Sequence, residues 1–301
     1  MPVRENIYEK IMSYKNNAQD IVRRELLKDL QEETKNDVII YASTFIPKFP
    51  GINVPSIDQD DIQGFMQCLN GLKSKKLDLI LHSPGGSLEA TEQIVTYLRS
   101  KYDYIRAFIP QSAMSAATML ACACDEIVMG KHSAIGPIDP QMIIPPHVLP
   151  AHSILAEFQQ AKEEILKDAN SAKIWVPKLL RIPQGYLDLC QKTIDNSKLK
   201  VAEWLDKYMF KNENVKRGKE IAEWLGNFEN HKTHGHPINY ELAQEHGLKI
   251  SLLECNQSLQ DKVLSVFHAV AMTFQVSSCV KLIENHFGKG SYLMVQTNLI
   301  R

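Results

Sequence analysis

The sequence lacks several features that mark specialised classes of protein. No stretch of its 301 residues reaches the ~18 consecutive apolar residues of a membrane span, and its first residues lack the apolar core of a secretion signal. Lys and Arg (34) nearly balance Asp and Glu (35), so no net field favours nucleic acid or an anionic membrane. We find no internal repeat and no low-complexity linker. These absences predict a cytoplasmic globular protein with no membrane segment and no nucleic-acid partner.

Cysteine is also scarce, with six residues scattered along the chain. This spacing fits reduced, mostly buried thiols better than a disulfide framework. Cys122 and Cys124 form a C-x-C pair, but no second pair stands at zinc-site spacing, and the small residues around them indicate a packed helix. We therefore expect neither a bound metal nor a cofactor.

The chain does contain a regular alternation of strand and helix patterns. Mainly apolar segments at 77–81, 104–109 and 126–129 are typical of buried strands, and helical patterns at 89–99 and 113–124 separate them. This order implies right-handed βαβ units and a parallel sheet, hence an α/β fold.

Helical patterns flank this centre. Apolar residues at helical spacing over 4–35 predict one or two helices laid on the domain or on a partner subunit, and a proline-rich stretch at 137–150 predicts a long functional loop. We expect a short helix closed by Gly247 and a last strand at 248–253. The predicted divisions are an N-terminal helical extension at 1–36, a main domain at 37–255 with a helical insertion at about 151–228, and a C-terminal helical extension at 256–301, with its helix over 256–286.

A glycine-rich turn, Ser83-Pro84-Gly85-Gly86-Ser87, follows the first of the buried strands. Its glycines can adopt positive φ and bring the backbone against a ligand. Backbone N–H groups exposed at such a turn suit a carbonyl oxygen that is gaining negative charge. The alternative is an ordinary tight turn, and the spacing matches neither common nucleotide-binding fingerprint.

Ser115 lies in a second strand-to-helix segment, residues 110–118. At such a turn its hydroxyl is expected to point into open space, with the backbone N–H of Ala116 beside it, and the helix dipole favours an oxyanion there. These properties suit a serine nucleophile. The alternative is a helix N-cap, a role for which Ser112 competes.

Two later segments carry candidate partners for this serine. Asp139 lies between Pro137 and Pro140, whose stiff backbone suits a fixed catalytic acid, although a turn acid fits equally. The loop at 231–238 holds three histidines, but their spacing matches no zinc pattern, and no acidic or cysteine ligand lies close in sequence. Three alternatives stay open: one of them is catalytic, all are solvated loop residues, or they bind a metal, which this spacing does not favour.

In chain order these segments resemble the Clp-type peptidase and crotonase superfamily, and within it the serine dehydrogenase proteinase family. The resemblance runs from about Val38 to Leu253 and rests on LILHSPGGS at 79–87, AMSAAT at 113–118, DEIVMG at 125–130, GPIDPQ at 136–141 and HGHPI at 234–238. It implies an α/β fold of the ClpP/crotonase type, a ββα superhelix with added N- and C-terminal helices and an active site at helix N-termini.

The resemblance also implies roles for individual residues. Ser115 becomes the nucleophile of a Ser-Asp-His triad with Asp139 and His234, in which the imidazole must lie between the hydroxyl and the carboxylate. The oxyanion-hole donors fall on Gly85, Gly86 and Ala116. His236 is an alternative base, and related signal-peptide peptidases use a lysine instead. Lysines in a region suited to that role are Lys162, Lys167 and Lys173.

The implied activity is that of a serine peptidase, which hydrolyses protein or peptide substrates through an acyl-enzyme on Ser115. Its chemistry needs no ATP and no metal, and members of this superfamily commonly form homo-oligomers. Two alternatives remain open. A crotonase-like acyl-CoA enzyme would use the same turns for a thioester carbonyl, but no glutamate base stands beside the second turn. A non-catalytic oligomeric scaffold with a Clp-like fold would be favoured by a buried Ser115 with no histidine near its hydroxyl.

Overall fold

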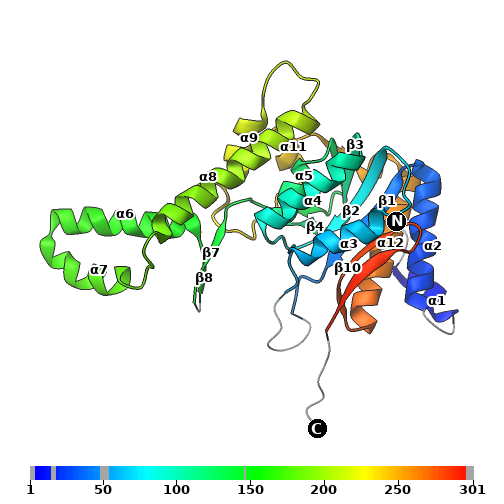
Figure 1. The fold of residues 1–301 in the computed structure, drawn as a ribbon, viewed down its shortest axis with the longest axis horizontal. Helices are drawn as coiled ribbons and strands as arrows, with labels where there is room; N and C mark the ends of the chain where they lie inside the picture. The colour runs from blue at the N-terminus through cyan, green and yellow to red at the C-terminus, as the bar shows by residue number, and fades with distance from the viewer. Residues whose placement is uncertain (1–3, 15–17, 48–53, 146, 296–301) are drawn as a thin grey trace, which may run out of the picture.

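A seven-stranded sheet forms the centre of the molecule (Figure 1). The computed structural model describes residues 4–14, 18–47, 54–145 and 147–295. The strands of the sheet are β1 (Asp37–Ser43), β2 (Lys76–His82), β3 (Tyr104–Ile109), β5 (Glu126–Met129), β9 (Ile250–Leu252), β10 (Cys279–Asn285) and β11 (Gly290–Met294). Their spatial order is β11-β10-β1-β2-β3-β5-β9, in which β1, β2, β3, β5 and β9 run parallel. Strand β10 pairs antiparallel with β1, and β11 pairs antiparallel with β10.

The parallel strands are apolar on both faces because helices cover both. On one face pack the crossover helices α3 (Asp60–Leu69), α4 (Leu88–Lys101) and α5 (Ala116–Cys122), against side chains such as Ile39 and Leu79. On the other face pack α2 (Ala18–Thr34) and α12 (Gln257–Val276), against Val38 and Ile80. The buried run expected at 77–81 is therefore a strand between two helical layers, and the predicted α/β arrangement with a parallel sheet is present.

The N-terminal segment is helical, as its spacing predicts. Helix α1 (Arg4–Met12) and α2 pack on α12, and the fully buried Arg23 of α2 is paired with the fully buried Glu284 of β10. The helices thus lie on this chain's own domain.

The helical prediction for the C-terminal part is wrong for residues 277–295, and residues 296–301 of that predicted extension lie outside the described residues. Helix α12 ends at Val276, and residues 279–294 form the hairpin β10–β11, which pairs with β1. The strand predicted at 248–253 is present as β9, but it is not the last. Buried charges on β10 hide its strand pattern, because Lys281 and Glu284 look solvent-exposed in sequence and are both buried.

The proline-rich stretch 137–150 is more ordered than the predicted loop. It contains an antiparallel ribbon, β7 (Gln141–Ile144) with β8 (His147–Pro150). Beyond it, α6 (Ala151–Lys167), a 3₁₀ turn (Ala169–Ser171), α7 (Ala172–Leu179) and the start of α8 (Tyr186–Trp204) form an arm that extends away from the sheet (Figure 1). The arm has a small core of its own, which includes Met142, Ile154 and Ile194.

The chain returns from the arm to the main core through the second half of α8. A π-helix (Leu205–Met209), α9 (Gly218–Gly226), α10 (Phe228–His231) and α11 (Tyr240–Glu245) follow, so the helical character expected at 151–228 is confirmed. Gly247, with φ of +91°, ends the short helix as predicted. Across the ranges that the structure describes, no helix combines the length and the apolar character needed to cross a bilayer.

Candidate active site

The glycine-rich turn leaves the C-terminal end of β2 and leads into α4. Gly85 and Gly86 have φ values of +106° and +152°, in the region that favours glycine. Neither position has room for a side chain: a Cβ on Gly85 would lie 2.6 Å from the Cβ of Ser115, and one on Gly86 would lie 2.3 Å from the carbonyl oxygen of Ile57. The two glycines therefore allow three backbone segments to meet at one point.

A short extended segment around Ile57 holds this turn in place. The N–H of Ile57 donates to the carbonyl of Gly85 over 2.7 Å, and the N–H of Ser87 donates to the carbonyl of Ile57 over 2.9 Å. The N–H of Gly85 donates to the hydroxyl of Ser83 at 3.2 Å. Within the described ranges the N–H of Gly86 has no such partner, and it is free to bind a ligand.

Ser115 joins the two-residue strand β4 (Ser112–Ala113) to α5. Its φ of 52° and ψ of −122° are unusual for a residue with a side chain, and its hydroxyl makes no capping bond to the helix. Such a backbone costs about 1–3 kcal/mol and persists only where its surroundings enforce it. Here the enforcing bonds run from the N–H of Met114 to the carbonyl of Ser83 and from the N–H of Ser83 to the carbonyl of Ser112.

The N-cap alternatives for both serines fail. The Ser115 hydroxyl caps nothing, and Ser112 pairs with Ala134 of the short strand β6 (Ala134–Ile135). Ala116 is the first residue of α5, so its N–H is one of the donors that an α-helix leaves unsatisfied at its start. Ser115 is half-buried beside this donor.

Asp139 and His234 form a direct pair. The Nδ1 of His234 lies 2.9 Å from Oδ1 of Asp139, and the amide of Gln141 donates to Oδ2 of the same carboxylate over 3.1 Å. Asp139 is 1% exposed and His234 is half-buried. A carboxylate accepts the Nδ1 proton, so Nε2 is left as the basic nitrogen of the ring.

Ser115 and His234 line one pocket of about 440 Å³. Gly85, Gly86 and Ala116 line it too, so five of the six residues predicted for the triad and the oxyanion hole lie around one pocket. Asp139 reaches the pocket through His234. In this structure the hydroxyl of Ser115 and the ring of His234 share the pocket without a direct hydrogen bond.

The alternative bases lie elsewhere. His236 packs with its ring centroid 5.5 Å from that of His231, a buried residue whose pKa is lowered by its burial, and it does not line the pocket. The three candidate lysines are exposed side chains of the arm, on α6 or α7. They are Lys162, Lys167 and Lys173. None of them lines the pocket that holds Ser115, which disfavours them as its base.

Sequence reasoning missed several pocket residues. Gln141 ends the GPIDPQ segment at 136–141, but its side chain was not predicted to take part in the site. Thr193 and Ser197 reach the pocket from α8, about 80 residues after the nucleophile in the chain. No local pattern marks them, because they approach the site only through the return of the arm. Among the described residues, no group of three or more His, Cys, Asp or Glu side chains is arranged to hold a metal ion.

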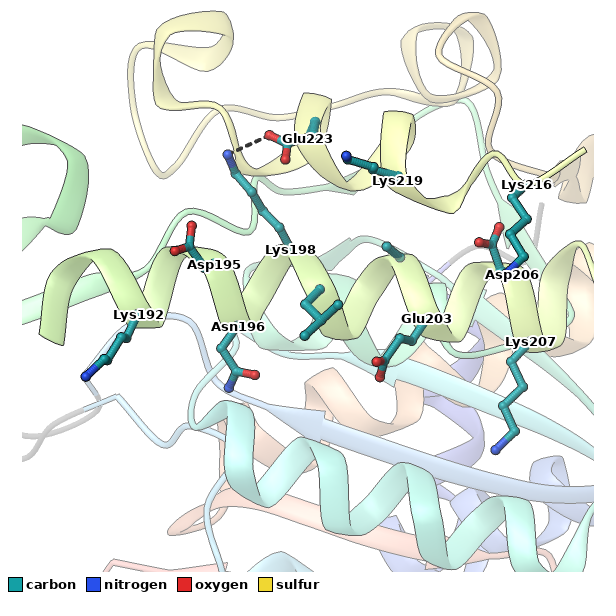
Figure 2. A pocket seen from close by; sticks show the side chains of 12 residues that line it. Lys192, Asp195, Asn196, Lys198, Glu203, Asp206, Lys207, Lys216, Lys219 and Glu223 are labelled. Carbon is teal, nitrogen blue, oxygen red and sulfur yellow. Dashed lines mark hydrogen bonds and ion pairs between the residues drawn. The ribbon is translucent and has the colours of Figure 1, made fainter. Parts of the chain in front are cut away.

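A larger cavity, of about 1040 Å³, lies between α8 and α9 (Figure 2). Lysines and acids alternate along both helices, and the ion pair between Lys198 and Glu223 spans them at 2.7 Å. None of the predicted site residues lines it. Its mixed charges favour no ligand of one sign, so size alone does not make it the functional site.

Two proteins of Methanocaldococcus jannaschii, both described as uncharacterized, are similar to this chain. One is 31% identical over 234 residues, which cover 76% of this chain and 73% of the relative. The other is 32% identical over 178 residues, which cover 58% of this chain and 52% of the relative. Among solved structures, a mutant of a membrane-bound stomatin-specific protease matches with a TM-score of 0.37 and 16% identity, over 63% of this chain and 69% of that one.

The family match is broader. The family described as ClpP-like SDH-type serine proteinases matches residues 10–261, which include every residue of the candidate site. This match confirms the resemblance drawn from the sequence motifs and the ClpP-like α/β fold that it implies. The chain belongs to the ClpP-like SDH-type serine proteinase family.

Proposed function

We propose that this protein is a serine peptidase that cleaves peptide bonds through an acyl-enzyme on Ser115. The observation that carries the proposal is the shared pocket: a serine on a strained turn, an Asp-paired histidine and two unpartnered backbone N–H groups line or adjoin one cavity. Membership of a serine proteinase family supports the same activity.

In the proposed reaction the Oγ of Ser115 attacks the carbonyl carbon of the scissile bond. Nε2 of His234 takes the hydroxyl proton and returns it to the leaving amine, while Asp139 holds the ring in the required tautomer. Water then attacks the acyl-enzyme with the same histidine as base, which releases the acid product and restores Ser115.

The developing oxyanion is assigned to the N–H groups of Gly86 and Ala116. Both donors lack a protein partner within the described ranges, whereas the N–H of Gly85 is engaged by Ser83. We therefore refine the expected pair to Gly86 and Ala116, with Gly85 providing the close approach to Ser115.

A fluorophosphonate probe tests the proposal directly, because it reacts with activated serines. We expect one label per chain, located at Ser115 by peptide mass spectrometry and absent from Ser115→Ala, together with hydrolysis of unfolded casein by the native protein alone. Since no proposed step uses a metal or a nucleotide, EDTA and ATP should leave the labelling rate unchanged. Labelling that persists in Ser115→Ala would contradict the proposal.

The scaffold alternative expects a buried Ser115 with no histidine near it, and the half-buried Ser115 shares its pocket with His234 instead. The homo-oligomer remains a prediction. Large apolar side chains exposed on the arm support it, for example Leu166 (78%), Ile174 (75%) and Leu180 (80%). Light scattering coupled to size exclusion measures the assembly.

A further inference from the structure

The oxyanion role proposed for Gly86 depends on where the segment before α3 lies. Gly86 has backbone contacts with Ile57 so close that even a methyl group has no room between them. The two hydrogen bonds at Ile57, to the carbonyl of Gly85 and from the N–H of Ser87, fix the orientation of the peptide plane that carries the Gly86 N–H. Any shift of the Ile57 segment is therefore transmitted to that donor.

The Ile57 segment is not itself part of a sheet. It pairs with the glycine turn through a single bridge, and two of its residues, Val54 and Ser56, line the pocket. One bridge is too little to hold an extended segment in place, because the net contribution of a single backbone hydrogen bond is small. A further constraint has to position it.

Lys281 supplies that constraint from the far end of the sequence. Its ammonium donates to the carbonyl of Ser56 over 2.9 Å and contacts Asp58 and Asp61 at 2.8 Å each. An ammonium has three N–H groups, so every donor of this side chain is used. Lys281 is 5% exposed, and a buried charge that is fully paired in this way resists displacement.

The backbone that carries Lys281 is held firmly by the central sheet. Lys281 lies on β10, between β1 and β11, opposite Ser43 and Leu293. Asp61 is fixed in turn, because its second oxygen accepts from the hydroxyl of Tyr41 over 2.8 Å and from the N–H of Asp58 over 3.0 Å. The network therefore ties both ends of residues 56–58 to the central sheet.

We infer that Lys281 is a positioning residue for the oxyanion hole: its ammonium holds the Ser56–Asp58 segment, which in turn sets the Gly86 N–H against Ser115. The inference rests on the proposed function of Ser115. Lys281 lies outside residues 10–261, the part of the chain matched by the family, so this support comes from a hairpin beyond the matched region.

The test measures two quantities on the native chain and its variants. One is the labelling of Ser115 by a fluorophosphonate, resolved into the maximal rate constant kinact and the half-saturation constant KI. The other is hydrogen exchange at the Ser87 amide, which reports the bridge to Ile57. The main variant is Lys281→Met, which keeps the volume of the stem and removes the ammonium.

A second variant guards against misfolding. Lys281→Met leaves Asp61 buried without its counter-charge, so Lys281→Met combined with Asp61→Asn removes both charges and keeps an acceptor for Tyr41. The matched control is Lys289→Met, in the same hairpin. Its exposed ammonium donates to the carbonyl of Asn70, away from the pocket.

We expect kinact to fall by about tenfold or more in both Lys281 variants, with KI changed less than about twofold, because complete loss of one oxyanion-hole donor costs about 100- to 1000-fold and a displaced donor loses part of that. Exchange at Ser87 should accelerate in the same variants and stay unchanged in Lys289→Met. A role in stability alone would lower the melting temperature and leave kinact per folded molecule unaltered.

Two other results for the Lys281 variants would overturn the inference. An unchanged kinact in a folded Lys281 variant overturns the inference, and so does a fall in kinact with Ser87 still protected, because the argued route passes through that bridge. If the unmodified protein is not labelled at Ser115, the proposed function itself fails. That result is separate from any difference between variants.

Discussion

Gly85→Ala is the substitution that best tests how the two turns of the site meet. The new methyl group would lie 2.6 Å from the Cβ of Ser115, whereas ordinary contacts begin at 3.4 Å, so Ser115 has to move by about 0.8 Å. A misplacement of about 1 Å at a reacting group costs roughly 100-fold in rate. We therefore expect the rate of fluorophosphonate labelling to fall by about two orders of magnitude.

The same substitution should lower the free energy of unfolding. Alanine at a φ of +106° carries backbone strain of about 1–3 kcal/mol, and the contact with the carbonyl oxygen of Met114, at 2.7 Å, adds overpacking of about 1–3 kcal/mol. The expected loss is about 2–6 kcal/mol of the free energy of unfolding, measured by urea denaturation. Labelling is measured below the unfolding transition, so that the two effects are separated.

Gly185→Ala provides a matched control. Gly185 also has a positive φ, of +75°, but it starts α8 on the exposed arm, and a Cβ there meets no atom within 4 Å. Gly185→Ala should lower the free energy of unfolding by about 1–2 kcal/mol through backbone strain, and its Ser115 should be labelled at the normal rate. Normal labelling of Gly85→Ala, or an equal loss in Gly185→Ala, would refute the reasoning.

His234→Ala and Asp139→Asn should each slow labelling of Ser115 by roughly 10³-fold or more, because both residues are assigned to one triad. Samples quenched at successive times and analysed by mass spectrometry give the labelling rates. Changing the three arm lysines together to methionine should leave the same rate within about twofold, since their side chains are exposed on the arm. These lysines are Lys162, Lys167 and Lys173. Burial of His82 between Phe45 and Phe267 lowers its pKa from 6.5 to about 4, so the unfolded chain binds the proton more readily. About 3 kcal/mol of stability should thus be lost as the pH falls from about 6.5 to about 4, and urea titrations of His82→Phe should lack this component.

The candidate site could be predicted from sequence where its chemistry is local. A serine or a glycine pair at a strand-to-helix turn is visible in a short window, since parallel strands end at one edge of the sheet and place successive turns side by side. Gly85, Gly86, Ser115 and Ala116 belong to this class. The pairing of Asp139 with His234 was implied by family resemblance alone, because 95 residues separate them and no spacing rule joins them.

The missed elements share a different cause. The strand β10 carries Lys281 and Glu284, and charged residues normally indicate a solvent-exposed segment. Both are buried because partners arrive from distant segments, Asp58 and Asp61 for the lysine and Arg23 for the glutamate. A short window of sequence does not show ion pairs with distant residues. The helix predicted over 256–286 therefore extends past its observed end at Val276.

The strain at Ser115 yields a last prediction, one that separates backbone energy from chemistry. Ser115→Ala and Ser115→Gly both remove the nucleophile, but only glycine adopts a φ of 52° with a ψ of −122° without strain. Relief of about 1–3 kcal/mol outweighs the greater flexibility of unfolded glycine, which costs about 0.4–1 kcal/mol. The free energy of unfolding of Ser115→Gly should therefore exceed that of Ser115→Ala by about 1 kcal/mol, measured by urea denaturation.

Ser112 provides the control, because it is a strand residue without positive φ. There the alanine variant should be more stable than the glycine variant. If alanine is the more stable residue at both positions, the turn stores no strain, and the geometry of the nucleophile has to be explained by its contacts alone.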